Sequence, residues 1–151
     1  MLMNAQRQYD YEPMGHVVKE THVGINGSDK VLQYEYWPDG SIKRKQMADG
    51  TWTGQYTYDL AGRLNAVANG NAASASEPAM FVQSTAYNAR GQTTSITYGN
   101  GATSTYSYND QRGFLTRVLA TSGATTLLDQ NYTRNAKGMI TATTSPDVGR
   151  S

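Results

Sequence analysis

Apolar and polar residues alternate in short stretches of this chain, and most stretches end at a turn that contains glycine. Six times the sequence reads roughly Tyr-x-Tyr-(Asp/Asn)-x-x-Gly-x-apolar. Two tyrosines one residue apart share a face of a strand, because strand side chains alternate. The glycine supplies the positive φ of the bulge that follows a type I turn. Each copy therefore predicts a β-hairpin.

The copies differ in detail. The fourth has Thr85 in place of its first tyrosine, the fifth has one extra residue before its glycine, and the sixth has Arg134 in place of its second tyrosine. A fixed repeat of this length indicates that one architecture runs through the chain. The repeat-defining residues are Tyr11, Gly15, Tyr36, Gly40, Tyr58, Gly62, Tyr87, Gly91, Tyr108, Gly113 and Gly138.

Other turn signals lie between these motifs, at residues 24–27, 49–50, 100–101 and 122–123. Asp49-Gly50 and Asn100-Gly101 are typical of two-residue hairpins. We expect an all-β fold: about twelve short antiparallel strands in an open, curved meander sheet of hairpin repeats. The repeats span 9–144, between a lead-in at 1–8 and a tail at 145–151, with an exposed loop at 69–79. No segment predicts a helix.

The tyrosines are expected to form rows across the sheet, with rings that pack edge-on. The Asp, Asn or Glu after the second tyrosine is expected to bond the backbone amides of the turn. After each glycine the alternation resumes, as at residues 63–67. The apolar residue two positions after the glycine should therefore share a face with the tyrosines.

Composition narrows the function more than the fold. The 151 residues suit one domain, and the 38% apolar content, rich in tyrosine, suits a sheet surface better than a thick core. A net charge of +1 argues against general nucleic-acid binding, and the lack of cysteine excludes disulfides and thiolate metal sites. We expect no membrane span and no signal peptide at residues 1–7. These features are compatible with a cytoplasmic protein, with a protein exported by a leaderless route and with a piece of a larger protein.

These residues resemble the YD repeat of the Rhs family. Residues 58–64, Tyr-Asp-Leu-Ala-Gly-Arg-Leu, are very similar to the family's usual Tyr-Asp-x-x-Gly-Arg-Leu, and residues 106–109 and 112–115 are also similar. The resemblance covers about 9–144. It implies that the hairpins wind into a shell like those of Rhs proteins, the C components of Tc toxins and teneurins. In the bacterial members such a shell is hollow and holds a toxic domain.

The chain departs from that family in two ways. It is far shorter than a full shell, so its six repeats are expected to form a strip or a partial turn. Residues 145–150 also do not match the aspartate- and proline-rich segment at which such shells cleave themselves. We therefore expect a fragment, a split gene product or a small stand-alone relative.

Candidates for catalysis are few. His16 and His22 lie six residues apart, about 20 Å along a strand, and no other ligands cluster near them. General acid–base catalysis needs two carboxylates that converge on a substrate. The sequence instead places Asp39, Asp49, Asp59 and Asp110 at turns. We expect no enzyme activity, no cofactor and no metal.

A structural role, in which the strip encloses or presents a toxin or effector domain, is the first functional hypothesis. The partners would be other YD-repeat segments, or further copies of the chain, bound at the open sheet edges. The alternative is a carbohydrate- or surface-binding module. Its candidate glycan contacts are Trp37, Trp52, Lys43 and Lys45, for which packing and a solvated strand face are the competing interpretation.

Overall fold

The described part of the chain contains twelve antiparallel strands, and their order in the sheet follows their order in the chain. The computed structural model describes residues 6–25, 28–50, 52–71 and 78–146. This confirms the predicted all-β meander. The strands are β1 (Gln6–Tyr11), β2 (Val17–Ile25), β3 (Ser28–Tyr36), β4 (Ile42–Met47), β5 (Thr53–Tyr58), β6 (Leu64–Asn69), β7 (Met80–Tyr87), β8 (Thr93–Tyr98), β9 (Ala102–Tyr108), β10 (Leu115–Ser122), β11 (Thr125–Arg134) and β12 (Ile140–Thr144).

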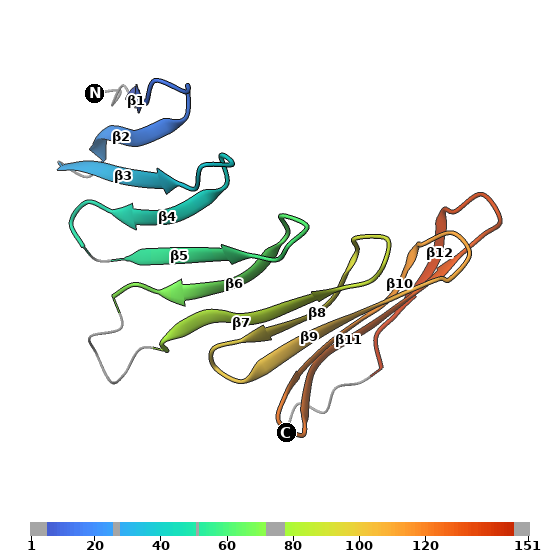
Figure 1. Cartoon of the computed structure of the whole chain (residues 1–151). Helices are drawn as coiled ribbons and strands as arrows, with labels where there is room; N and C mark the ends of the chain where they lie inside the picture. Colours follow the sequence, from blue (N-terminus) through green and yellow to red (C-terminus); the bar gives the residue numbers. More distant parts are fainter. Residues whose placement is uncertain (1–5, 26–27, 51, 72–77, 147–151) are drawn as a thin grey trace, which may run out of the picture. The chain divides into compact units, whose positions relative to one another are not determined.

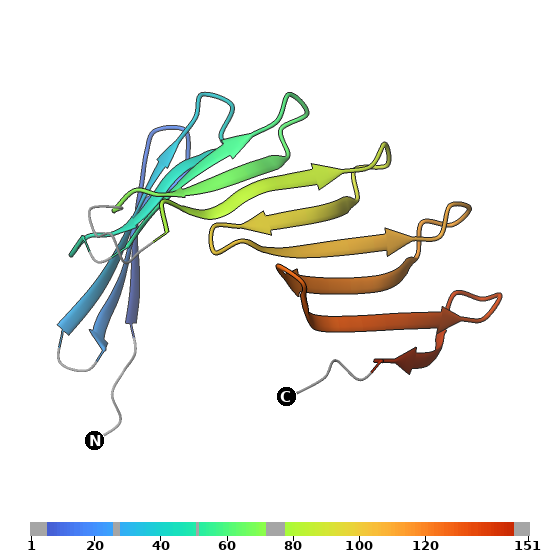
Figure 2. The same ribbon diagram turned by 90° about the horizontal axis from the view of Figure 1, so that it is seen from below.

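The chain divides into two compact units, residues 1–80 and 81–151, and each is described by itself. In each unit the turns of the Tyr-x-Tyr motif lie along one edge of the sheet, and the connecting turns lie along the opposite edge (Figures 1 and 2). We number the motif turns from one to six in chain order. The first three belong to the first unit and the last three to the second.

All six motif turns share one backbone pattern. The residue after the second tyrosine position donates its backbone amide across the turn, as Asp59 N does to Arg63 O at 2.8 Å. The repeat glycine then donates back, as Gly62 N does to Asp59 O at 3.0 Å. The repeat glycines have φ between 70° and 88°, a region that disfavours residues with a Cβ. The predicted turn with a glycine bulge is confirmed.

A second bulge follows in every motif hairpin, and the sequence analysis missed it. Tyr58 lies opposite Leu64, but Thr57 lies opposite Ala66, so Asn65 is an extra residue. The prediction that strict alternation resumes after the glycine was therefore wrong, because each extra residue shifts the strand by one position. The extra residues are Val18, Lys43, Asn65, Thr94, Thr116 and Thr141.

The sheet has one tyrosine face and one polar face. Tyr58 opposes Leu64 and Tyr56 opposes Val67, so the second and fifth residues after the glycine share the tyrosine face. Directly opposed residues of an antiparallel pair point to the same side. The predicted pairing of tyrosine with the apolar residue two after the glycine is confirmed.

Cross-strand polar pairs occupy the other face. In the first unit, Gln46 Nε2 donates to Gln33 Oε1 at 2.9 Å. In the second unit, Arg117 makes a two-pronged contact with Asp129, and both N–O distances are 2.7 Å. Such pairs link neighbouring strands through part-buried side chains.

Two connecting turns differ from the predicted two-residue form. Gly50 N donates to Met47 O at 3.0 Å and Gly101 N donates to Tyr98 O at 3.0 Å, so each glycine is the last residue of a four-residue turn. Both glycines have positive φ. The two-residue loop occurs instead at Gly123–Ala124, because Ser122 pairs with Thr125.

The predicted loop at 69–79 begins later than expected. Asn69 is buried and ends β6, and its amide donates to Ala79 O at 2.9 Å. Residues 72–77 lie outside the described part of the chain. Within that part, the only buried apolar residues are Ala66 and Val67. The hairpins are therefore held by neighbour contacts across a thin sheet rather than by a thick core.

Candidate functional site

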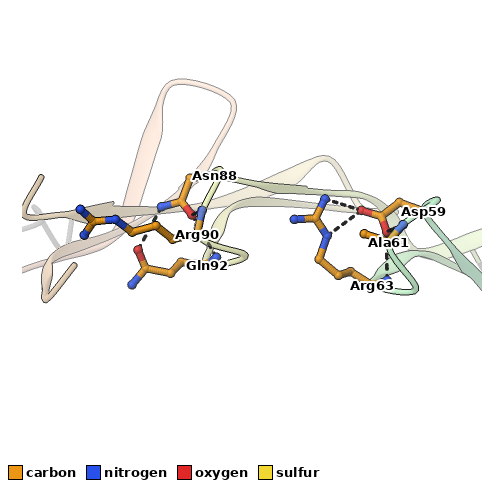
Figure 3. Close-up of polar contacts among 6 residues, drawn as sticks. All are labelled: Asp59, Ala61, Arg63, Asn88, Arg90 and Gln92. Carbon is orange, nitrogen blue, oxygen red and sulfur yellow. Dashed lines mark hydrogen bonds and ion pairs between the residues drawn. The ribbon is translucent and has the colours of Figure 1, made fainter. Parts of the chain in front are cut away.

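In the third to sixth turns, the Asp or Asn that follows the second tyrosine position accepts backbone amides of its own turn. In the third turn, Asp59 Oδ1 accepts the amides of Ala61 at 2.9 Å and Arg63 at 3.0 Å (Figure 3). In the fourth turn, Asn88 Oδ1 accepts the amides two and four residues on, both at 3.0 Å (Figure 3). Asn135 does the same in the sixth turn, and Asn109 accepts the amides two and three residues on in the longer fifth turn. The predicted turn-forming role of this position is confirmed for these four turns. In the first turn Glu12 contacts the His16 side chain, and in the second turn the position is Trp37.

Ionic contacts reinforce some of these turns. Arg63 Nε donates to Asp59 Oδ2 at 2.8 Å. This side-chain bond, followed by the amides of Arg63 and Ala61, lowers the pKa of Asp59. In the second turn, the Ser41 hydroxyl and amide bond to Asp39 Oδ1 and lower the pKa of Asp39. Both carboxylates are therefore ionised at neutral pH.

Three tyrosine hydroxyls each tie their hairpin to the preceding one. Tyr36 donates to Val17 O at 2.7 Å, and Tyr58 donates to Ile42 O at 2.9 Å. In the second unit Tyr108 donates to Thr93 O at 2.8 Å. We call these bonds the tyrosine clamps.

The acceptor in each tyrosine clamp is the carbonyl two residues after the preceding repeat glycine. Each clamp lies at the turn edge, where the chain does not connect the two hairpins. Burial raises the pKa of Tyr36, Tyr58 and Tyr108, so each hydroxyl keeps its proton as a donor. We expected rows of edge-on rings, but these three tyrosines instead contact the preceding hairpin through their hydroxyls. Equivalent positions two strands apart are separated by about 9.6 Å, which is too far for direct ring packing.

The sixth repeat replaces the clamp with a cation. Arg134 stands where the second tyrosine would be, and its guanidinium lies over the Phe114 ring, 5.4 Å from the centroid. Arg134 Nη1 also donates to Gly138 O at 3.1 Å. The arginine thus contacts both the preceding hairpin and its own turn.

In the second unit, side chains also cross from one turn to the next. Arg90, one residue before its repeat glycine, donates to Asp110 O at 2.6 Å. Gln92, one residue after the same glycine, donates to Gly113 O at 2.7 Å. From the fifth turn, Arg112 Nη1 donates to Ala136 O. The sequence analysis missed these contacts, although aligning the six turns shows a basic residue before each of the last three glycines.

The junction between the second and third turns is different. The corresponding positions are Asp39 and Ser41, which bond each other through Ser41 Oγ at 2.6 Å. They leave a groove of about 460 Å³, whereas the grooves at the fourth-to-fifth and fifth-to-sixth junctions measure about 330 Å³ each. We call it the Trp37 groove; its lining includes Trp37, Asp39, Ser41, Thr57, Tyr58 and Asp59.

The candidate glycan contacts do not form one cluster. Lys43 Nζ lies over the Trp37 ring at 5.2 Å, and Lys45 Nζ lies over the Tyr34 ring at 5.4 Å. Trp52 follows the connecting turn at the opposite end of β4, where its ring packs against Gly54. Both lysines are thus already engaged with aromatic rings, and the two tryptophans lie at opposite edges of the unit.

The two histidines also lie apart. His16 contacts the Glu12 carboxylate and stacks on Tyr36, with ring centroids 4.7 Å apart. His22 Nε2 lies 2.8 Å from Glu20 Oε1. Across the described residues, no three or more His, Cys, Asp or Glu side chains are grouped so as to hold a metal ion. The same residues contain no helix long and apolar enough to cross a membrane.

Comparison with known proteins agrees with this geometry. Residues 87–125 match the family described as RHS Repeat, which confirms the predicted resemblance over the fourth and fifth copies. No curated protein matches the chain.

Solved structures match nearly the whole chain. The TcdB2-TccC3 structure matches with a TM-score of 0.77 and 18% identity, over 94% of this chain and 8% of that chain. The TcdB2-TccC3-Cdc42 structure matches with a TM-score of 0.75 and 18% identity, over 90% and 7%. A Tc holotoxin pore from Photorhabdus luminescens with a mutant TccC3 matches with a TM-score of 0.74 and 18% identity, over 91% and 7%. The chain therefore has the fold of a segment that spans less than a tenth of those chains.

Proposed function

We propose that this chain, whose residues 87–125 match the RHS Repeat family, is a non-enzymatic wall segment of a YD-type shell that encloses or presents a toxin or effector domain. The tyrosine clamps carry the proposal. They join hairpin to hairpin through backbone carbonyls, so the contact depends little on the identity of the preceding side chain. A wall of many hairpins needs such a repeatable junction.

The outer strands support a partner that continues the sheet. β1 and β12 each have one neighbouring strand, and every residue of both is exposed. Open strand edges pair readily with further strands. Tyr11, the second tyrosine of the first repeat, is 61% exposed, so its hydroxyl is accessible to the carbonyl of another YD hairpin. The partners would be further YD-repeat segments or copies of this chain.

The native product tests the proposal. An antibody raised against residues 78–146 should detect a protein much larger than the 151-residue chain, or a stable complex with other YD-repeat chains. Electron microscopy of the purified assembly should place these hairpins in a shell wall. A native product of 151 residues that purifies alone as a monomer would contradict the proposal.

The sheet edges can be tested in the isolated chain. Thr143→Lys places a charge on the open strand β12 and should reduce concentration-dependent light scattering. Ser122→Lys places the same charge at an exposed position of an interior strand and serves as the control. Scattering that stays at the monomer value at all concentrations would show that the edges do not associate.

A further inference from the structure

At the junction that forms the Trp37 groove, the two residues beside the repeat glycine bond each other instead of the next turn. At the fourth-to-fifth junction, Arg90 and Gln92 reach the backbone of the next turn. At the second-to-third junction, Asp39 and Ser41 occupy those two positions and bond each other. The chain's own side chains thus leave this groove open.

The glycines show the same difference. A Cβ at Gly113 would meet Arg90 at 3.0 Å, and one at Gly138 would meet the Phe114 ring at 2.8 Å. A Cβ at Gly62, on the third turn, would have no heavy atom within 4 Å. The surface of the third turn is therefore uncovered on the side that faces the groove.

The lining of the groove favours a cation. Trp37 is 42% exposed, and its ring already accepts the Lys43 ammonium at 5.2 Å. Asp39 and Asp59 line the same groove; the Asp59 carboxylate is paired with Arg63, whereas the Asp39 carboxylate bonds the neutral Ser41. An aromatic face beside carboxylates is the usual environment of a guanidinium, which stacks on rings and donates to oxygens in its own plane.

The third turn supplies the matching acceptor. At the later turns the bridging arginines donate to carbonyls just before the next glycine: Arg112 to Ala136, two residues before it, and Arg90 to Asp110, three residues before it. Leu60 is the corresponding residue of the third turn. Its side chain is fully exposed at the turn tip, so an apolar side chain can contact it there.

We propose that the Trp37 groove binds an arginine side chain from another polypeptide, which takes the place that Arg90 and Arg112 take at the later turns. The guanidinium stacks on Trp37, pairs with Asp39 and donates to the carbonyl of Leu60. An apolar residue next to that arginine contacts the Leu60 side chain. The groove therefore recognises a short segment that contains an arginine beside an apolar residue.

The test uses the full chain labelled with ¹⁵N and the capped dipeptide acetyl-Leu-Arg-amide. The chain has two tryptophans, so its spectrum has two indole N–H signals, and Trp52→Phe assigns them. Titration should shift the Trp37 signal and leave the Trp52 signal in place. The citrulline dipeptide, which lacks the charge but keeps the shape, should produce no shift, and the lysine dipeptide should bind more weakly.

Variants separate the groove from general charge. Asp39→Asn keeps an acceptor for Ser41 and removes the charge, so it should weaken binding by up to about fivefold, the contribution of one exposed ion pair. Ser41→Gln, which introduces the residue found at Gln92, should close the groove and also weaken binding. Asp110→Asn, at a junction that Arg90 already bridges, should leave binding unchanged. Backbone amide spectra confirm that each variant is folded.

Three results would overturn the proposal. The first is an equal shift of both indole signals, which indicates nonspecific association. The second is unchanged affinity in Asp39→Asn, and the third is equal binding of the citrulline dipeptide. A neutral oligosaccharide that shifts the Trp37 signal when the arginine dipeptide does not would assign the groove to a sugar instead.

Discussion

The second-to-third junction in the first unit and the fifth-to-sixth junction in the second unit are built on the same turn but finish it differently. At the second-to-third junction, Asp39 and Ser41 bond each other and the third turn stays open. At the fifth-to-sixth junction, Arg112 and Phe114 cover the sixth turn. The repeated backbone is thus compatible with either a closed or an open tip.

The tyrosine clamp is the same at open and bridged junctions. Tyr58 donates to Ile42 O at 2.9 Å at the open junction, and Tyr108 donates to Thr93 O at 2.8 Å at the bridged fourth-to-fifth junction. The tyrosine and the glycine therefore form the common framework. The residues on either side of the glycine decide what each turn contacts, so recognition can vary along the edge while the sheet stays intact.

Substitution of the repeat glycine by alanine should give the largest difference in stability between the two junctions. Gly62→Ala should cost about 1–2 kcal/mol, because a Cβ is unfavourable in the left-handed region. Gly138→Ala should cost about 2–4 kcal/mol, because its Cβ would also lie 2.8 Å from the Phe114 ring. Urea unfolding, together with amide hydrogen exchange in each hairpin, measures both values.

Phe114 provides the control for this pair. Combined with Phe114→Ala, the extra cost of Gly138→Ala should largely disappear, whereas Gly62→Ala should be unaffected by the same change. Equal costs for the two single alanine variants would show that the covered and open tips do not differ energetically.

Removal of a clamp hydroxyl should have a similar effect at either kind of junction. Tyr58→Phe and Tyr108→Phe should each lower local stability by about 0.5–1.5 kcal/mol, the net contribution of one hydrogen bond. Hydrogen exchange should increase mainly in the hairpins that each bond joins, because repeats open locally. Tyr11→Phe, on the outer strand β1, should change stability by less than about 0.5 kcal/mol. A loss that is confined to one of the two junctions would contradict a common framework.

Truncation of a bridging side chain should have a smaller effect. Arg112→Ala removes an exposed bond to the sixth turn and should cost about 0.2–1 kcal/mol, judged by exposed charged contacts. Lys137→Ala is the control, since it changes the same motif position in the last turn. Hydrogen exchange in the sixth turn should increase only in the first variant. An equal increase in both would indicate a general effect of charge.

The sequence was sufficient to predict the strands and the motif turns, because tyrosine pairs, turn residues and glycines are local signals. Asp59 and Asn88 were recognised as turn-forming for the same reason. The second bulge was missed because an extra residue such as Asn65 has no distinctive chemistry. A signal was present in the spacing of Leu64 and Val67, three residues apart where alternation requires two or four.

The tip contacts could not be predicted from one repeat at a time. Arg90 resembles any exposed arginine until the next turn is placed beside it, because its acceptor is a backbone carbonyl twenty residues away. The same holds for the tyrosine clamp, whose acceptor can be any residue. The Trp37 groove depends on two small residues of the second turn, Asp39 and Ser41. Their significance is clear only by comparison with Arg90 and Gln92, which bridge the corresponding junction in the second unit.

The smallest expected effect is a difference between the third and fourth turns in how their stability depends on pH. Asp59 and Asn88 each accept the backbone amides two and four residues on in their own turn, but only the Asp59 side chain can be protonated (Figure 3). The Arg63 side chain is the largest cause of the lowered pKa of Asp59, so protonation should begin below the ordinary aspartate value of about 3.9. The stabilisation is then fully present above that value and is lost as the pH falls through the lower folded pKa.

Amide NMR between pH 7 and pH 2 measures this difference. The Ala61 and Arg63 signals should titrate together with an inflection below about 3.9, whereas those of Arg90 and Gln92 should stay nearly constant. Asp59→Asn should make the third turn as insensitive to acid as the fourth. An inflection above 3.9 in the unmodified chain would mean that Arg63 does not hold the carboxylate. An equal movement of the Asn88 turn would mean that the acid response belongs to the whole sheet.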